Sequence, residues 1–433
     1  MLHPDRFFDS DPGVRRVARE LYDNVKDLPL VCPHGHVDPR LLAYDEPFDE
    51  PTSLFLLPDH YILRMLYSAG VSMEDLGVQP SDDAHFETDP RAVWQRFGDN
   101  YYLFRGTPTR AWLDYELHEV LGIDRRLTGQ TAMGIYDEIA ERLKTPAFRP
   151  RALFHRFNIE VLTTTDGAAD SLEHHRAIRE SGWGGRVLPC FRPDSVFKIS
   201  AGGWVAARQM LEAAVGYDVD SYATFINALE ERRAFFKQNG ATSTDHGVGS
   251  ARTHRMSDAE AAKLFEKALR QTATNDDEAD FEAHMLMEMA RMSVEDGLVM
   301  QIHPGVYRNH NESIHSRFGP DRGGDIPVRA EYTRNLHALL NAFGCDPRFR
   351  LIVFTLDEST YARELAPLAG HDPALRIGPA WWFFDSIEGM KRHRECIIET
   401  AGFYNTAGFN DDTRAFLSIP ARHDLARRVD ANY

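Results

Sequence analysis

The stretch LVCPHGHVDP, residues 30–39, puts two histidines directly after a short apolar run. The run at residues 28–32 predicts a buried strand, and alternate side chains of an extended chain point to the same face. His34 and His36 can therefore converge on one point, and Gly35 lets a ligand approach the backbone closely. Neutral imidazole is a common ligand of zinc and its neighbours in the first transition row. Taken alone, the pair is also compatible with two hydrogen-bonded core histidines.

The composition is that of a globular chain, with 433 residues of which 43% are hydrophobic and 27% are charged. A net charge of −17 argues against nucleic acid or an anionic membrane as the partner. The sequence has no run of about 18 uncharged apolar residues, and its N-terminus shows no basic segment followed by an apolar one. We therefore expect a cytoplasmic globular protein.

Short apolar runs alternate with helical stretches along the chain. Residues 11–26 predict a first helix, because Asp11 and Pro12 suit an N-cap and a first turn. Strand-like runs lie at residues 28–32, 159–165, 186–191, 240–244, 298–303, 350–355, 375–379 and 401–406. The intervals between the later runs have room for crossover helices. Eight strand–helix units predict an α/β protein, a (β/α)₈ barrel of the TIM type.

The interval after the first run has a different pattern. Residues 40–150 show helical periodicity without a convincing strand, which predicts a mostly helical insertion after the first strand. Barrels with insertions reach this size as one domain. We therefore expect residues 1–433 to form a single domain.

Polar side chains concentrate at the ends of the predicted strands, where such barrels carry their chemistry. In chain order these side chains are His34, His36, Asp166, Arg192, Asp194, Asp245, His303 with Arg308 beyond it, Asp357, Trp381, Trp382, Asp412 and Arg414. One at a time, Asp166, Asp194 and Asp357 are typical of helix N-caps, and the tryptophans of core filling. The joint placement of histidines and aspartates at strand ends favours a functional site.

Several longer motifs follow one another in a fixed order. They are PDHY at 58–61 with Arg64, WLDYEL at 112–117, TTD at 164–166, DHG at 245–247, QIHPG at 301–305 with Arg308, WWF at 381–383 and DTR at 412–414. With these motifs the chain, from about residue 28 to residue 428, resembles the uronate isomerase family of the amidohydrolase superfamily. The resemblance implies a barrel of the amidohydrolase kind.

The resemblance also implies one divalent metal ion, usually zinc, held by His34, His36 and Asp412. It implies interconversion of an aldose uronate and its ketose, either D-glucuronate to D-fructuronate or D-galacturonate to D-tagaturonate. The motif matches carry over two groups of residues. The catalytic group is Asp412, Arg414, Tyr61 and His60, and the substrate-binding group is His303, Arg308, Trp381, Trp382 and Asp245.

The reaction moves a proton from C2 to C1 through an enediol, so it needs a base and groups that stabilise the developing oxyanion. We assign Asp412 as the base, and Arg414 and Tyr61 as the groups that polarise the reacting oxygens. His60, His303 and a tryptophan then hold the sugar acid.

Two other functions stay open at this point. A metal-dependent hydrolase acting on a sugar-acid-like ester, lactone or amide would use the same metal and carboxylate. A sugar-acid-binding or scaffold protein with a degenerate site is the non-enzymatic alternative. The partner expected in either enzyme is a small-molecule sugar acid, without nucleic acid or membrane, and association into a homo-oligomer is left open.

Overall fold

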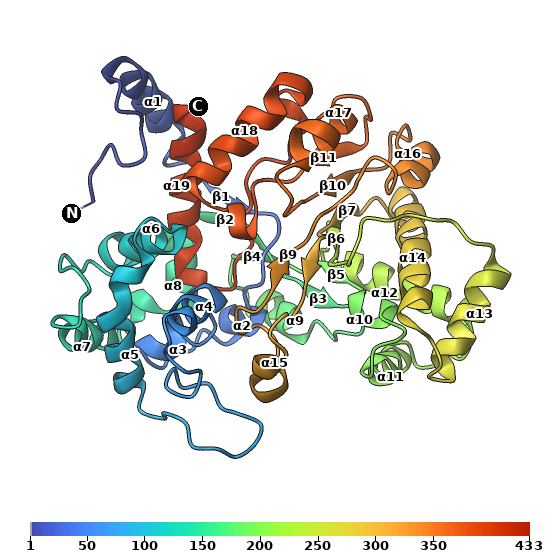
Figure 1. The fold of residues 1–433 in the computed structure, drawn as a ribbon, viewed down its shortest axis with the longest axis horizontal. Coiled ribbons are helices and arrows are strands. Elements are labelled where there is room, and N and C mark those ends of the chain that lie inside the picture. Colours follow the sequence, from blue (N-terminus) through green and yellow to red (C-terminus); the bar gives the residue numbers. More distant parts are fainter. Residues whose placement is uncertain (1) are drawn as a thin grey trace.

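The computed structural model describes residues 2–433, and its strands form a parallel sheet that curves around a common centre (Figure 1). The strands are β1 Leu30–Cys32, β2 Ile159–Thr163, β3 Asp166–Gly167, β4 Arg186–Leu188, β5 Phe191–Arg192, β6 Ser243–His246, β7 Val299–Ile302, β10 Leu351–Val353 and β11 Leu375–Ile377. Within the described residues the hydrogen-bonded orders are β1-β2-β4 and β11-β10-β7-β6-β5-β3. The two sheets are continuous, because β2 and β4 run on into β3 and β5 after two residues.

The barrel closes through an irregular segment instead of a regular eighth strand. Thr406 forms an isolated parallel bridge with Ile377, and the N–H of His36 donates to the carbonyl of Thr413 at 3.0 Å. The predicted strand at residues 401–406 is therefore wrong. Helix α18 (Ile387–Ala401) continues to its first residue, Gly402 ends that helix at a φ of +69°, and residues 403–405 form a 3₁₀ turn.

The fourth strand also begins later than predicted. Gly240 follows helix α12 with a φ of +97°, and the N–H of Ala241 still bonds the carbonyl of Phe236 at 3.0 Å. The chain is therefore extended only from Ser243, the first residue of β6. This shift places Asp245 inside the strand, with its side chain buried.

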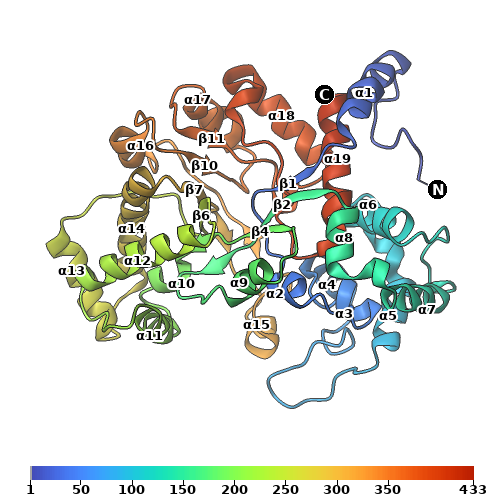
Figure 2. The same cartoon turned by 180° about the vertical axis from the view of Figure 1, so that it is seen from behind.

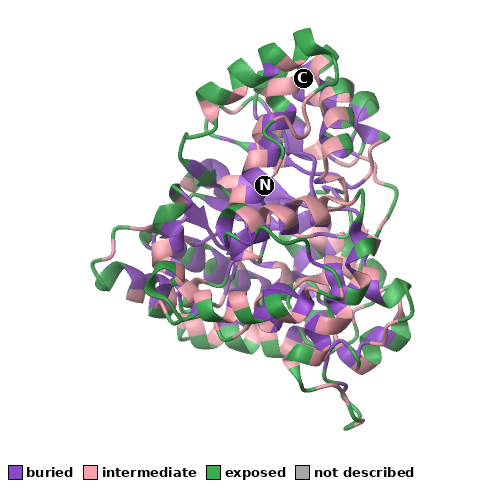
Figure 3. Ribbon diagram, turned by 90° about the vertical axis from the view of Figure 1, so that its left-hand side faces the viewer, coloured by how far each residue is buried: buried purple, intermediate pink, exposed green. Residues whose placement is uncertain are grey.

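The crossover helices pack on the outside of the sheet (Figure 1), and Figure 3 shows that helices turn exposed residues outward and buried residues toward the interior. They are α9 Glu173–Glu180, α10 Asp194–Phe197, α11 Trp204–Val215, α12 Tyr222–Gln238, α13 Asp258–Leu269, α14 Asn275–Asp296, α15 Glu312–Phe318, α16 His337–Phe343, α17 Ala366–Ala369, α18 Ile387–Ala401 and α19 Ile419–Asn432. A small hairpin of β8 (Val306–Tyr307) and β9 (Ile326–Pro327) flanks α15.

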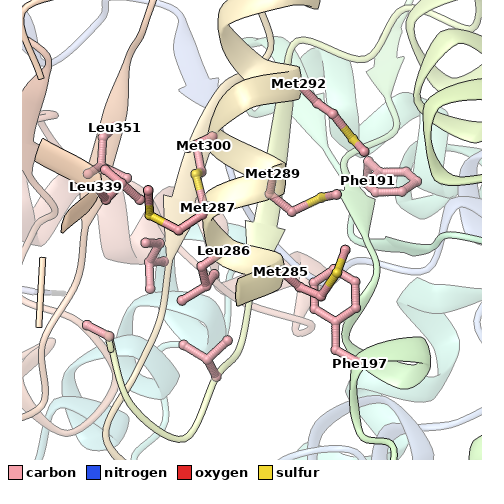
Figure 4. Packing of buried hydrophobic residues seen from close by; sticks show 14 of the residues in the cluster. Phe191, Phe197, Met285, Leu286, Met287, Met289, Met292, Met300, Leu339 and Leu351 are labelled. Carbon is pink, nitrogen blue, oxygen red and sulfur yellow. The ribbon is translucent and has the colours of Figure 1, made fainter. Parts of the chain in front are cut away.

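Helix α14 shows how sequence sets one of these elements. Thr274 caps it in a capping box with Asp277, and Gly297 ends it with a φ of +78°. The helix buries a row of methionines against the barrel, together with phenylalanines of neighbouring segments (Figure 4). Unbranched methionine side chains fill such an irregular interface well.

The insertion after β1 is helical, as predicted. Its helices are α2 Pro39–Tyr44, α3 Pro51–Phe55, α4 His60–Ser68, α5 Pro90–Asn100, α6 Pro108–Tyr115, α7 Ala132–Leu143 and α8 Pro150–Arg156. They gather at one side of the barrel, opposite α10 to α14, in both ribbon views (Figures 1 and 2). They enclose a hydrophobic core of their own that reaches β1 and β2. Five of these helices, α2, α3, α5, α6 and α8, begin with proline, which suits a first helical turn because no N–H bond is lost there.

The two ends of the chain are joined at the same side of the molecule. Helix α1 (Pro12–Val25) starts as predicted, because the carboxylate of Asp11 accepts from the N–H groups of Gly13 and Val14. It packs on α19 near the C-terminus (Figure 1). Among the helices of residues 2–433, none is long and apolar enough to cross a membrane. That the chain forms a single domain stays a prediction.

Glu116, at the end of α6, gives a testable pH dependence. Burial, and to a lesser extent the nearby Asp59 carboxylate, raise the pKa of Glu116 to about 8. Between its ordinary pKa and 8, the unfolded chain binds fewer protons than the folded one, so stability falls as pH rises through this window. We expect Glu116→Gln to gain stability relative to the parent by about 4 kcal/mol on going from pH 5 to pH 9.

Thermal unfolding at the two pH values measures this difference. The matched control is Glu119→Gln, because Glu119 lies on the same helical turn with an exposed side chain. Its unfolding temperature is expected to follow that of the parent at both pH values. If the unfolding temperatures of Glu116→Gln and the parent changed equally between the two pH values, that would contradict protonation of Glu116 in the folded state.

Candidate active site

One large cavity of about 1280 Å³ opens at the carboxyl ends of the barrel strands. All eleven residues predicted for the site line it, namely His34, His36, His60, Tyr61, Asp245, His303, Arg308, Trp381, Trp382, Asp412 and Arg414. They come from strand ends far apart in the sequence and from the insertion. The roles assigned to them stay predictions, while their assembly in one cavity is a property of the fold.

The centre of the cavity holds His34, His36 and Asp412. The Oδ1 atom of Asp412 lies 3.1 Å from Nε2 of His36 and 3.5 Å from Nε2 of His34. The side chain of His34 is 1% exposed and that of Asp412 is 8% exposed. Asp412 has a φ of +39°, so the backbone is not extended at this residue. Asp412 and Arg414 nevertheless both face the cavity.

The protonation states of this cluster suit a cation. Burial lowers the pKa of His34 to about 4, so its imidazole is neutral near pH 7. Burial acts to raise the pKa of Asp412, but the adjacent His34 and His36 outweigh it and keep that pKa below its ordinary value. Two imidazoles and one carboxylate form a donor set that zinc and related divalent ions accept. Nδ1 of His34 is buried without a hydrogen-bond partner.

His303 and Asp245 form a second buried pair beside this cluster. Nδ1 of His303 donates to Oδ1 of Asp245 at 2.6 Å, and the His303 ring stacks on His34 with centroids 4.6 Å apart. This bond leaves Nε2 of His303 as a buried atom without a partner. His34, Asp245 and His303 are also close enough to hold a cation together. The Arg192 guanidinium, 3.3 Å from Asp245, makes that second position less favourable for a positive ion.

The insertion delivers His60 and Tyr61 to the cavity. Asp59 caps α4 (His60–Ser68), accepting from the N–H groups of Tyr61 at 2.8 Å and Ile62 at 3.3 Å. The rings of His60 and Tyr61 stack with centroids 4.4 Å apart. Burial, and then the charge of Arg414, lower the pKa of His60 to about 4. His60 is therefore a neutral hydrogen-bonding group near pH 7, and burial also raises the pKa of Tyr61.

The two tryptophans form part of the wall. Trp381 meets His303 edge to face with centroids 4.8 Å apart, and Arg308 lies over the ring of Trp382 at 4.9 Å. Trp382 has a φ of +52°, which turns the chain sharply after Trp381. Its indole Nε1 is buried without a hydrogen-bond partner. Both residues line the cavity, so core filling alone does not describe them.

Sequence reasoning missed an arginine–aspartate pair of the cavity. Nε of Arg192 donates to Oδ2 of Asp194 at 2.6 Å, and the same oxygen accepts from the N–H of Gly247 at 2.9 Å. The N-cap interpretation of Asp194 is wrong, since Pro193 occupies the cap position and Asp194 is the first helical residue. Asp166 is no cap either, because it lies in β3 and accepts from Thr164 and Cys190. The only signal for Arg192 was its place at a strand end.

A buried arginine in the wall of the cavity, Arg422, was also missed. Nη1 of Arg422 donates to Oδ2 of Asp385 at 2.6 Å, and the guanidinium lies over the Trp112 ring at 3.6 Å. The same group faces the carbonyl of Asp411, one residue before Asp412. Arg422 thus connects α19, the insertion and the segment after β11 at the wall of the cavity.

The parallel strands, with a His-x-His pair after the first strand and an aspartate at the closing segment, define a (β/α)₈ barrel of the class that carries a candidate metal site at its centre. Within that class the sequence profile of glucuronate isomerase matches residues 12–433, and the chain belongs to this family.

Individual relatives are similar to this chain over its whole length. Proteins named uronate isomerase from Nostoc punctiforme and Rhizorhabdus wittichii are 55% and 56% identical to it, covering 100% of this chain and 92% and 91% of theirs. The crystal structure of glucuronate isomerase from Caulobacter crescentus superposes with a TM-score of 0.98 at 52% identity, covering 100% of this chain and 90% of that one.

Proposed function

We propose that the protein is a uronate isomerase that interconverts an open-chain aldose uronate and its 2-ketose. The observation that carries this proposal is one cavity that joins the His34, His36 and Asp412 cluster to His60, Tyr61 and Arg414. Membership of the glucuronate isomerase family supports the same reaction. D-glucuronate and D-galacturonate are the substrates we propose, with D-fructuronate and D-tagaturonate as products.

Asp412 is the proposed base. Its charged carboxylate takes the proton from C2 of the aldose, the electron pair moves to the C1 carbonyl, and O1 gains a proton to give the enediol. Return of the proton from Asp412 to C1, with loss of the O2 proton, gives the ketose. A positioned general base of this kind contributes about 10²–10⁴-fold to a rate.

Arg414 and Tyr61 stabilise the oxygens on which charge develops. Both line the cavity near Asp412, and a fixed donor aimed at a developing oxyanion is worth about 3–4 kcal/mol. A divalent ion held by His34, His36 and Asp412, for which we propose zinc, would supply Lewis-acid stabilisation of the same oxygens. Metal identity and the presence of one ion stay proposals.

The remaining predicted residues are proposed to bind the sugar acid. Arg308 bonds Asp325 at 2.7 Å and covers Trp382, so its guanidinium is held at the cavity wall. His303 offers a free Nε2, and Trp382 a free indole N–H. Hydroxyl and carboxylate groups of an open-chain uronate can satisfy these atoms. Asp245 fixes the tautomer of His303, and Trp381 packs edge to face against the His303 ring.

A panel of uronates and of lactones and esters separates isomerase from hydrolase. We expect new ketose signals in NMR spectra with D-glucuronate or D-galacturonate, and no acid release from the lactones and esters. Release of acid without ketose formation would support the hydrolase instead. The cytoplasmic location, the absence of nucleic-acid and membrane partners, and a homo-oligomer stay predictions.

A further inference from the structure

The loop at residues 319–325, between α15 and β9, carries two aspartates to two arginines of the cavity. Asp321 Oδ2 lies 3.2 Å from Nη1 of Arg414. Asp325 accepts from Nη1 of Arg308 at 2.7 Å and from the N–H of Asn309 at 2.8 Å. The loop therefore contacts both a proposed catalytic arginine and a proposed substrate-binding arginine.

Close packing fixes this loop against the insertion. Gly323 has a φ of +81°, and a Cβ atom there would lie 2.4 Å from Cβ of Arg64 and 2.9 Å from the carbonyl of His60. Only glycine fits such an approach in this backbone conformation. Asp321 itself has a φ of +61°, which non-glycine residues seldom adopt. The contact with Arg414 is thus imposed by a tightly held turn.

The ion pair of Asp321 and Arg414 contributes little to the stability of the fold. The two side chains are 45% and 40% exposed, and pairs in such surroundings add little stability. Burial acts to raise the pKa of Asp321, but the charge of Arg414 and its hydrogen bond outweigh it, so that pKa lies below its ordinary value. Asp321 therefore presents a fixed negative charge at the cavity wall near neutral pH.

A uronate offers Arg414 two kinds of oxygen. A free guanidinium binds a carboxylate through two parallel hydrogen bonds, which is stronger than its bond to a neutral carbonyl. An unrestrained Arg414 would therefore hold the substrate by its carboxylate, with the aldehyde end away from Asp412. The carboxylate of Asp321 is already bound to one edge of Arg414, so it opposes binding of the substrate in this reversed orientation.

We propose that Asp321 is a positioning and specificity-determining residue for Arg414. It orients the guanidinium toward the reacting oxygens, and its charge keeps the carboxylate of the substrate from binding there. This inference rests on the proposed function, because it concerns how the same cavity orients a uronate. The cavity residues of the barrel carry out the isomerisation. Asp321 of the loop determines which end of the substrate lies beside them.

The variant Asp321→Asn keeps the shape and an acceptor oxygen but removes the charge. We expect kcat to fall about 10-fold and KM to fall about threefold or more, because the reversed arrangement binds tightly without reacting. Asp321→Glu, which restores the charge, is expected to return kcat to within about threefold of the parent. A defect of folding would instead raise KM or leave it unchanged, and would not be repaired by glutamate.

The chain offers a matched control in Asp82→Asn. Asp82 Oδ2 bonds Nε of Arg317 at 2.8 Å, with side chains 52% and 36% exposed, and neither residue lines the cavity. This pair has a similar exposure to that of Asp321 and Arg414. Kinetic constants of Asp82→Asn are expected to equal those of the parent.

Binding of D-gluconate, measured by titration calorimetry, tests the proposal without turnover. D-gluconate is an open-chain sugar acid with no aldehyde or ketone, so it cannot isomerise. Asp321→Asn is expected to bind it about threefold or more tightly than the parent does, and Asp82→Asn equally to the parent. If the parent does not isomerise uronates, the proposed function fails while this comparison still tests Asp321. Gluconate affinity in Asp321→Asn equal to or weaker than that of the parent would overturn the proposal.

Discussion

Replacing Asp412 with asparagine is expected to lower kcat for uronate isomerisation by about 10³-fold or more and to stop exchange of the C2 hydrogen with D₂O. The amide is isosteric but cannot accept the proton from C2. The carboxylate is almost fully buried, and its Oδ1 atom lies 3.1 Å from Nε2 of His36 at the centre of the proposed site. Initial rates and NMR detection of deuterium at C2 measure the two effects.

Asp411→Asn is the control for local damage to this segment. Its carboxylate faces away from the cluster, with Oδ2 3.0 Å from Nε2 of His423, and it does not line the cavity. We expect this variant to keep C2 exchange. Metal analysis of the Asp412→Asn protein separates loss of a ligand from loss of the base. Unchanged exchange in Asp412→Asn would move the base elsewhere, with Tyr61 or His60 the next candidates.

Arg414→Lys should keep the fold and lower kcat by about 10²-fold or more. Lysine retains the charge but lacks the planar fork that bonds Asp321 and an oxyanion at once. The lost interaction belongs to the transition state, so kcat should change more than KM does. Arg317→Lys, at the ion pair with Asp82 outside the cavity, is the matched substitution. It is expected to leave kcat and KM unchanged. Values of kcat and KM near those of the parent in Arg414→Lys would contradict the proposed electrostatic role of Arg414.

The barrel and the centre of the site were predictable because both follow from periodic patterns. Alternating strand and helix signals specify parallel strands, and parallel strands bring their carboxyl ends to one face. His34, His36 and His303 could therefore be grouped without knowing any distance. The N-cap at Asp11 was equally predictable, because a cap depends on local spacing alone.

The parts that were mispredicted depend on irregular backbone. The segment that closes the barrel forms an isolated β-bridge instead of a regular strand, so its sequence lacks the alternation of a strand. Ala401, where the strand was predicted to start, belongs to helix α18. Asp412 adopts a positive φ that spacing cannot reveal. Asp194 resembles a cap in sequence because an aspartate at a helix start fits both roles. Asp321 reaches Arg414 only through the packing of Gly323, which no pattern encodes.

Incubation of the purified protein with D-glucuronate in D₂O, followed by NMR, tests the central claim most directly. Proton transfer by a base at the cluster of His34, His36 and Asp412 predicts formation of D-fructuronate that carries deuterium at C1, because the proton held by Asp412 exchanges with solvent. D-Galacturonate should give D-tagaturonate labelled at the same carbon. Absence of any ketose from either uronate would contradict the isomerase, and a ketose entirely free of deuterium would contradict transfer of the proton through a base that exchanges with solvent.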